Sequence, residues 1–448
     1  LLFPQTLPRM SHSPCMLRGA RALFRCARFE SRAPTSGWAG YANAAVDETS
    51  ASQPSTSGQG LFLPSNQLTA ASVGGYYALE PRLLPEASRA YAGAFYAPRD
   101  AGHERRGGCK ALQHEVEATG THAVMYRPVM HTLYNAVGER SHQRLLLTGP
   151  AGAGKSIALA GLVEWARQQG WIVMYVPSCS ALVRGGYFSP RGDTGTWDTL
   201  TSAQQLLKGM LDAHGPQLKS LPVLAPAQQP AAAEGTAADA EVGGAEWAAA
   251  AAARGKTLYD VVTGGLTEDD NAQLAVDSAL AVVQQLVASS GEQPGGSGSL
   301  APPVQVLFAL DDYNCLYGSS DYGVQPPSAV PIKARRRVLQ AQELNLARGM
   351  RLLEAKSLGG AAVVAATTTA MPLPAPKQLP PQQQQSLTEL LVPGFSEVET
   401  RNALAHYHAT RHATELATSR QARELFALTQ GNARELRISA STLGLRLA

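Results

Sequence analysis

The chain has 448 residues, of which 44% are hydrophobic and 16% charged, a composition typical of globular proteins and unlike that of a disordered chain. Its net charge of +3 is too small either to require or to exclude a nucleic-acid partner. No apolar run approaches the length of a membrane span, so we expect no membrane partner, and five scattered cysteines without Cys-x-x-Cys spacing argue against a disulfide framework or a zinc site.

Residues 1–60 combine a basic start with a polar stretch of low complexity. Five arginines precede the first acidic residue, Glu30, and residues 31–60 are rich in Ser, Ala, Gly and Thr. An arginine-rich, acid-poor start is typical of a mitochondrial or chloroplast transit peptide, and the stretch after it predicts a flexible arm. A basic tail that contacts RNA phosphates is the alternative.

Residues 61–143 form an extension that leads into the core, which we place at 144–394. Short apolar runs of the kind buried on both faces of a parallel sheet are found at 144–148, 171–177, 304–310 and 361–368. We therefore predict four strands of a parallel sheet.

Helices are predicted between these strands. The apolar residues of 157–169 fall on one helical face, and this helix ends at Gly170. A second helix is predicted over 334–357. Because strands alternate with helices, we predict an α/β fold, a parallel sheet with helices on both of its faces.

Three stretches of the core look like insertions, at 221–255, 289–303 and 371–386. Their bias toward Ala, Pro, Gly and Gln supplies little apolar surface to offset the entropy lost on ordering. We therefore expect them to be surface loops, and the Ala-rich part of 221–255 to be able to form a local helix.

After the core, residues 395–448 predict a small helical C-terminal subdomain. Ser396 and Glu399 have the spacing of a capping box at a helix start, and a later helix ends at Gly431.

A phosphate-binding pattern lies between the first predicted strand and its helix. The stretch RLLLTGPAGAGKS fits the Walker A spacing, with Gly149 first and Gly154, Lys155 and Ser156 last. Glycines let backbone N–H groups approach phosphate oxygens, Lys155 reaches the outer phosphates, and the hydroxyl of Ser156 is a Mg²⁺ ligand. The predicted nucleotide-binding residues are Gly149, Pro150, Ala151, Gly152, Ala153, Gly154, Lys155, Ser156 and Ile157. An ordinary glycine-rich turn, the alternative, needs neither the lysine nor the hydroxyl.

Two carboxylates follow the apolar run at 304–310. Asp311 comes directly after it, where P-loop proteins carry the carboxylate that holds Mg²⁺, so Ser156 and Asp311 are the predicted metal ligands. Asp312 stands where many P-loop ATPases carry a glutamate that polarises the attacking water. It is our candidate catalytic residue, although its side chain is one methylene shorter.

Other polar residues have two interpretations each. Thr367, Thr368 and Thr369 end a strand, where they either sense the terminal phosphate or join strand to loop. Arg434 is either a lid arginine over the phosphates or a surface residue. The chain has no Asn-Lys-x-Asp motif for guanine, so the residues alone leave GTP and ATP open.

A basic cluster is predicted at the start of the helix over 334–357. Its members are Lys333, Arg335, Arg336 and Arg337. Positive charges at a helix N-terminus gain nothing from the helix dipole, which favours RNA phosphates as partners; a solvated surface run is the alternative.

Several blocks in the same order resemble the death-associated protein 3 family, the P-loop protein of the mitochondrial ribosomal small subunit. They include the phosphate loop, WIVMYVPSCSALV, TWDTLTSAQQLL, VLFALDDYNCLYG, GGAAVVAATT and LFALTQGNARELR, preceded by GGYYALEPRLLP and VMYRPVMHTLYNAV. The resemblance extends from about Ser72 to the C-terminus, with the insertions removed.

The resemblance implies an AAA-like P-loop fold and a mitochondrial matrix protein in the small subunit, among ribosomal RNA and proteins rather than in a homo-oligomer. It also implies a purine nucleotide, with GTP or GDP favoured over ATP, bound with Mg²⁺ through Gly149–Ser156 and Asp311. Family members often have glycine where this chain has Asp312.

Three functions remain after these observations. The first is a structural ribosomal protein that holds a nucleotide, the second an active AAA-like or signalling NTPase, and the third a P-loop kinase. The chain lacks a glutamate after the metal carboxylate and shows no identifiable arginine finger, so we favour the first, with at most slow hydrolysis.

Overall fold

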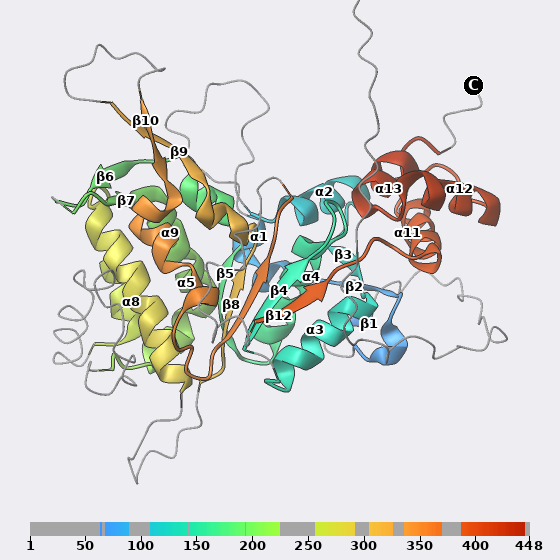
Figure 1. Cartoon of the computed structure of the whole chain (residues 1–448). Coiled ribbons are helices and arrows are strands. Elements are labelled where there is room, and N and C mark those ends of the chain that lie inside the picture. Colours follow the sequence, from blue (N-terminus) through green and yellow to red (C-terminus); the bar gives the residue numbers. More distant parts are fainter. Residues whose placement is uncertain are drawn as a thin grey trace, which may run out of the picture. The chain divides into compact units, whose positions relative to one another are not determined.

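The central sheet has five strands, all parallel, in the order β12-β4-β11-β8-β5 (Figure 1). They are β4 (Arg144–Thr148), β5 (Ile172–Val176), β8 (Val306–Leu310), β11 (Ala362–Ala366) and β12 (Leu387–Leu391). The computed structural model describes residues 63–64, 68–88, 108–141, 143–192, 194–224, 256–291, 304–325, 336–369 and 387–443. Four of the strands confirm the predicted ones, and β12 was not predicted.

Helices cover both faces of this sheet, as predicted. Successive strand residues point to opposite faces. Met174 and Phe308 belong to the core on one face, and their neighbours Val173 and Leu307 belong to the core on the other. The first core is completed by α5 (Leu200–Ser220), α7 (Leu258–Gly264), α8 (Ala272–Ser290) and α9 (Asn345–Gly349), and the second by α2 (Lys110–Thr119), α3 (Pro128–Gly138) and α4 (Lys155–Gln168).

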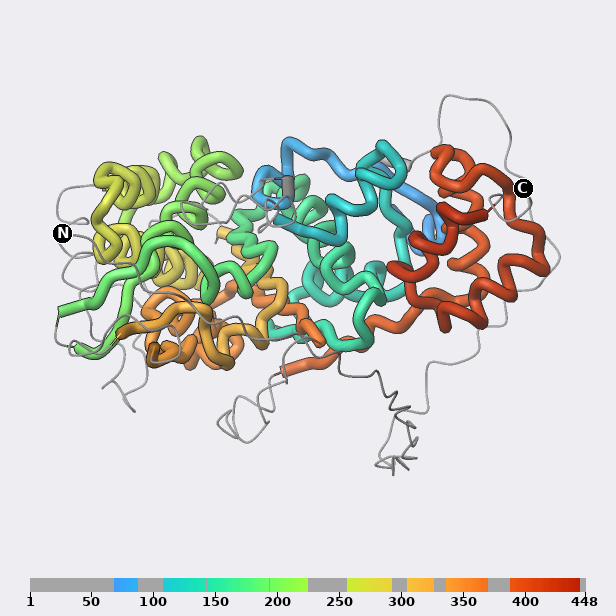
Figure 2. Tube along the Cα trace, turned by 90° about the horizontal axis from the view of Figure 1, so that it is seen from above, coloured from blue at the N-terminus to red at the C-terminus, as the bar shows by residue number. Residues whose placement is uncertain are grey.

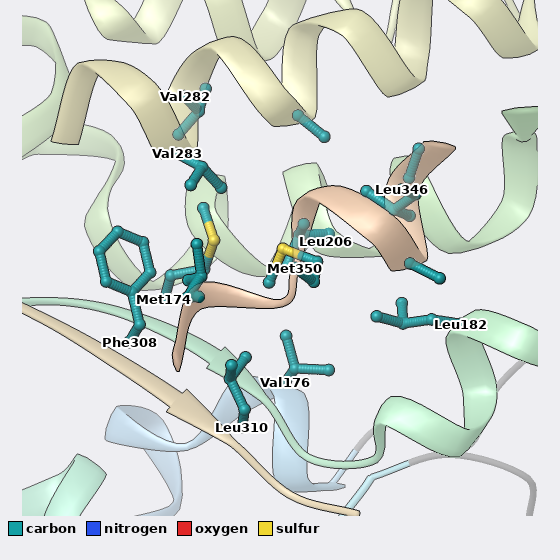
Figure 3. Close-up of a cluster of buried hydrophobic side chains, with 14 of the residues drawn as sticks. Met174, Val176, Leu182, Leu206, Val282, Val283, Phe308, Leu310, Leu346 and Met350 are labelled. Carbon is teal, nitrogen blue, oxygen red and sulfur yellow. The ribbon is translucent and has the colours of Figure 1, made fainter. Parts of the chain in front are cut away.

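The core under α5 and α8 is a continuous apolar layer. Figure 3 shows Phe308 of β8 and Met174 of β5 near Val282 and Val283 of α8, with Leu310 of β8 further along the same cluster. All five side chains are 5% exposed or less, so the strands are buried by helices rather than by loops. This burial explains why these strands are apolar throughout.

The N-terminal extension and the C-terminal helices pack against each other. The extension contains β1 (Leu63–Pro64), β2 (Tyr76–Ala78), β3 (Ala123–Met125) and the short helix α1 (Pro85–Ser88). The C-terminal part contains α11 (Glu397–Ala409), α12 (Ser419–Thr429) and α13 (Ala433–Ala440). Figures 1 and 2 show these three helices, in red, next to β2, β3 and α2, and Met125 is part of their apolar cluster.

Local signals at the C-terminal helices are confirmed. The hydroxyl of Ser396 accepts a hydrogen bond from the N–H of Glu399, and the carboxylate of Glu399 accepts one from the N–H of Ser396. Helix α12 is followed by Gln430 and Gly431, both in the left-handed region of backbone conformation.

The predicted helix over 334–357 is wrong. Residues Arg337–Gln340 form strand β10, which pairs antiparallel with β9 (Ser319–Val324). In the described part of 334–357, the short helix α9 is the one α-helix that follows. Pairing with β9 therefore overrides the helical pattern. Lys333 and Arg335 of the basic cluster lie outside the described residues. Arg336 donates to the carbonyl of Gly323, so the described part of the cluster belongs to a hairpin and not to a helix start.

The insertions are shorter than predicted. Residues 221–224 belong to the fold, because Val223 and Leu224 are buried and the N–H of Val223 donates to the carbonyl of Lys256. Ser289 and Ser290 end α8. Residues 225–255, 292–303 and 371–386 of the predicted insertions, and all of residues 1–60, lie outside the described residues.

Helix α8 is the one described helix that is long and apolar enough to cross a membrane. The expectation that no apolar run approaches the length of a membrane span is therefore wrong for this helix. However, 61% of its most apolar stretch is buried inside the protein, by the core shown in Figure 3. Its apolar character is therefore that of a core helix.

Candidate functional site

The glycine loop, which we define as Gly149–Ser156, connects β4 to α4 as predicted. Gly149, Gly152 and Gly154 have φ values of 133°, 76° and 96°, a region that side chains with a Cβ rarely adopt. Gly154 is the residue at which α4 begins its first turn. The glycines are therefore required by the backbone path of the loop.

Donors from side chains occupy the carbonyl groups of this loop. The ammonium group of Lys155 donates to the carbonyls of Gly149 and Pro150, both at 2.8 Å. Within the described part of the chain, the N–H groups of Gly152, Gly154, Lys155 and Ser156 have no protein acceptor. N–H groups without acceptors at a helix N-terminus form a binding site for an anion.

The two predicted metal ligands are brought together. Asp311 follows β8, the strand next to β11, and its buried carboxylate lies close enough to the hydroxyl of Ser156 for that hydroxyl to favour the charged form of the carboxylate. Burial and the neighbouring Asp312 raise the pKa of Asp311 to about 7. The described residues contain no group of three His, Cys, Asp or Glu side chains that would hold a metal without help. A cation here would therefore need water or phosphate oxygens as further ligands, which suits Mg²⁺.

Asp312 is held by a neighbouring strand end. Its φ of 54° is left-handed, and its carboxylate accepts a hydrogen bond of 2.9 Å from the hydroxyl of Ser178, which follows β5. The side chain is thus already engaged by the protein at the position where a catalytic glutamate would stand.

Two of the remaining predicted residues, Thr367 and Thr368, have partners within the fold. The hydroxyl of Thr367 donates to the carbonyl of Leu147 at 3.2 Å, and the N–H of Thr368 donates to the side chain of Asn314 at 2.9 Å. These contacts join β11 to β4 and to the segment after β8. Arg434 is exposed, on the first turn of α13.

A protein-family model, described as mitochondrial ribosomal death-associated protein 3, matches residues 123–439, well over half of the 448-residue chain. The chain belongs to this family. It is therefore a mitochondrial ribosomal protein, located in the mitochondrion, and the resemblance of its sequence blocks is confirmed. The search of curated proteins found no match.

The range matched by the death-associated protein 3 family begins at β3 and ends in α13. It therefore includes the glycine loop and Asp311, and also two residues that the sequence analysis missed, Arg127 and Asn432. Both side chains donate to carbonyl groups of the glycine loop, Arg127 to Ala153 at 2.7 Å and Asn432 to Ala151 at 2.9 Å.

Sequence signals for these two residues exist, but they do not identify the partner. Arg127 precedes Pro128, the first residue of α3, and Asn432 caps α13 with its side-chain oxygen. Asparagine before a helix predicts a cap. The amide nitrogen of Asn432 does not take part in the cap and can make another contact. The structure shows that this contact is to the glycine loop.

Proposed function

We propose that this mitochondrial ribosomal protein is a structural constituent of the small subunit that holds a purine nucleotide with Mg²⁺ in its glycine loop. GTP or GDP is the favoured ligand and ATP the alternative. The observation that carries the proposal is the proximity of the Ser156 hydroxyl to the Asp311 carboxylate, beside the N–H groups of Gly152, Gly154, Lys155 and Ser156, which have no acceptor among the described residues. This combination supplies both an anion site and a hydroxyl–carboxylate pair for a divalent cation.

Each residue has a stated part in binding. The N–H groups of the loop would donate to phosphate oxygens, and the ammonium group of Lys155 would exchange the carbonyls of Gly149 and Pro150 for a phosphate. The hydroxyl of Ser156 and the carboxylate of Asp311 would hold Mg²⁺, with water and phosphate oxygens as its other ligands.

The nucleotide serves mainly to stabilise the fold. A ligand that binds only the folded state, at a concentration about a hundredfold above its Kd, stabilises that state by about 2.7 kcal/mol. Rapid hydrolysis needs an aligned water and a positive charge at the departing phosphate. Asp312 is engaged by Ser178, and Arg434, the one lid candidate, is an exposed residue of α13. Both observations favour a nucleotide that is kept over an active NTPase.

The nucleotide affinity of the variant Lys155→Ala tests whether the glycine loop is the nucleotide-binding site. Lys219→Ala is the matched control, because Lys219 lies on α5 over the ring of Tyr259 and outside the glycine loop. Calorimetric titration with Mg·GDP, Mg·GTP and Mg·ATP should show a loss of about tenfold or more for Lys155→Ala, or 1.4 kcal/mol, and none for the control. Equal affinities in both variants would refute the site.

Gradient sedimentation of the tagged full chain from isolated mitochondria tests its place in the ribosome. We expect the protein to migrate with small subunits, and Lys155→Ala to do so less completely than Lys219→Ala. Migration only with large subunits or only as free protein would contradict the proposal.

A further inference from the structure

We infer that Asn432 and Arg127 connect the glycine loop to helices α11–α13, so that a nucleotide in the loop fixes the position of the C-terminal helices. This inference rests on the proposed function, because it concerns how the same site is coupled to another part of the protein.

Asn432 has two different contacts through one side chain. Its oxygen accepts from the N–H groups of Arg434 and Glu435, at 3.1 and 3.2 Å, and so caps α13. Its amide nitrogen donates to the carbonyl of Ala151 in the glycine loop. A Cβ atom on Gly152 would overlap with the Asn432 side chain, so the start of α13 lies directly against the loop.

Arg127 reaches three parts of the protein at once. One terminal nitrogen donates to the carbonyl of Ala153, and the other donates to the carbonyls of Pro393 and Gly394, both at 3.0 Å. The same guanidinium group forms an ion pair with Glu399 on the first turn of α11. The residue is 5% exposed, so these bonds are made away from water.

The connection between β12 and α11 also follows the glycine loop. The N–H of Val392 donates to the carbonyl of Thr148, and a Cβ atom on Gly149 would overlap with the carbonyl of Val392. The N–H of Phe395 donates to the carbonyl of Gly431, which joins this connection to the start of α13. The glycine loop therefore contacts the connection to the C-terminal helices directly, without a layer of side chains between them. A change in the backbone of the loop would act on this connection.

Phosphate binding changes the bonds next to these contacts. In this structure Lys155 holds the carbonyls of Gly149 and Pro150, and Ala151 is the next residue. Moving the ammonium group to a phosphate releases two carbonyls and alters the peptide that Asn432 holds. By linkage, if the bound loop favours the docked position of α13, the docked position raises nucleotide affinity by the same factor.

Other contacts keep the C-terminal helices folded when the loop contact is removed. The side chain of Asn402 donates to the carbonyl of Gly74 at 2.9 Å, and the ring of His406 stacks on Tyr76 at 3.8 Å. Arg437 forms an ion pair of 3.6 Å with Glu115 of α2. These contacts involve the N-terminal extension and not the glycine loop, so a variant of Asn432 tests the coupling alone.

The test is hydrogen–deuterium exchange of the full chain, with and without saturating Mg·GDP or Mg·GTP, together with the nucleotide affinity. Asn432→Ser keeps an oxygen that caps α13 but loses the donor to Ala151, since serine is as good a capping residue as asparagine. Asn402→Ser is the matched control, because it removes a contact of the same helices that does not involve the loop.

In the unmodified chain and in Asn402→Ser, the nucleotide should slow exchange over Glu397–Ala409 and Ala433–Ala440 by about fivefold or more. In Asn432→Ser the nucleotide should slow exchange in the glycine loop but not over Ala433–Ala440. The affinity of this variant for the nucleotide should be lower than that of the unmodified chain by the factor of about five or more by which exchange of these helices is slowed there. Failure to bind any nucleotide overturns the proposed function and the inference with it. Binding without protection of these helices, or with equal protection in Asn432→Ser, overturns the inference alone.

Discussion

The guanidinium group of Arg127 contacts both carboxylate oxygens of Glu399, at 2.7 and 3.3 Å, across 272 residues of sequence. Glu399 uses one of these oxygens a second time, because it also accepts from the N–H of Ser396 at the start of α11. The pair therefore attaches a C-terminal helix to the N-terminal extension through a cap that is itself part of the helix.

Arg127→Met should destabilise the protein by about 3–5 kcal/mol, because it leaves the buried carboxylate of Glu399 without its partner. Urea unfolding of the full chain measures this difference. In the double variant Arg127→Met with Glu399→Gln the buried charge is removed as well, and at least half of the loss should be recovered. A double variant no more stable than Arg127→Met would contradict the explanation.

Gly149→Ala should abolish nucleotide binding and destabilise the fold more than Gly170→Ala does. Both glycines have positive φ, but a Cβ atom at Gly170 meets nothing within 4 Å, whereas one at Gly149 meets the carbonyl of Val392. We expect about 1–2 kcal/mol for Gly170→Ala from backbone conformation alone. Urea unfolding and nucleotide titration of the two variants compare them directly, and equal effects would show that the loop can move away from Val392.

Stability should fall between pH 6.5 and pH 4 because of His214. Burial and the charge of Arg167 lower the pKa of His214 to about 4 from its ordinary 6.5, and its ring accepts from the N–H of Val173. Between pH 6.5 and pH 4, His214 is protonated in the unfolded chain but stays neutral in the folded chain. The stability is thus fully present above pH 6.5, and about 3 kcal/mol is lost by pH 4.

His214→Gln removes this titration. Its stability deficit relative to the unmodified chain, measured by urea unfolding at pH 7.5, 5.5 and 4.5, should shrink as the pH falls. His406, whose pKa burial also lowers to about 4, is unchanged in both proteins and cancels in the comparison. A deficit that stays constant across this range would show that His214 is not the titrating group.

Asp312→Asn should leave nucleotide turnover unchanged. The amide oxygen of asparagine still accepts from Ser178, and asparagine tolerates the left-handed backbone at this position. We expect hydrolysis at about 10⁻³ s⁻¹ or slower for both proteins, as in GTPases that lack an arginine finger. Turnover of many nucleotides per minute that is lost in Asp312→Asn would instead identify an active NTPase.

Much of the site could be predicted because its signals are local. The apolar strand, the glycines and the helix from Lys155 onward are consecutive in sequence, and Asp311 directly follows a strand. The capping box of Ser396 and Glu399 spans four residues. Such short-range patterns are set by backbone geometry and not by distant partners.

The rest depends on contacts between distant segments. Strand β10 was mistaken for a helix because its antiparallel partner, β9, determines its structure. Strand β12 reads LTELL, and its polar Thr388 and Glu389 do not resemble a buried strand. The contact of Arg127 with Glu399 could not be predicted because the two residues are far apart in sequence. The same is true of the contact of Asn432 with Ala151.

The position of β4 in the sheet has a consequence for synthesis of the chain. Its two neighbours, β11 and β12, both come from the C-terminal half of the sequence. A nascent chain that ends before Leu387 has the whole glycine loop but neither β12 nor the connection that lies against Gly149. Because distant pairings form late in folding, the loop reaches its final conformation only after β12 and Val392 have been synthesised. Nucleotide capture would then distinguish chains that include β12 from chains that end before it.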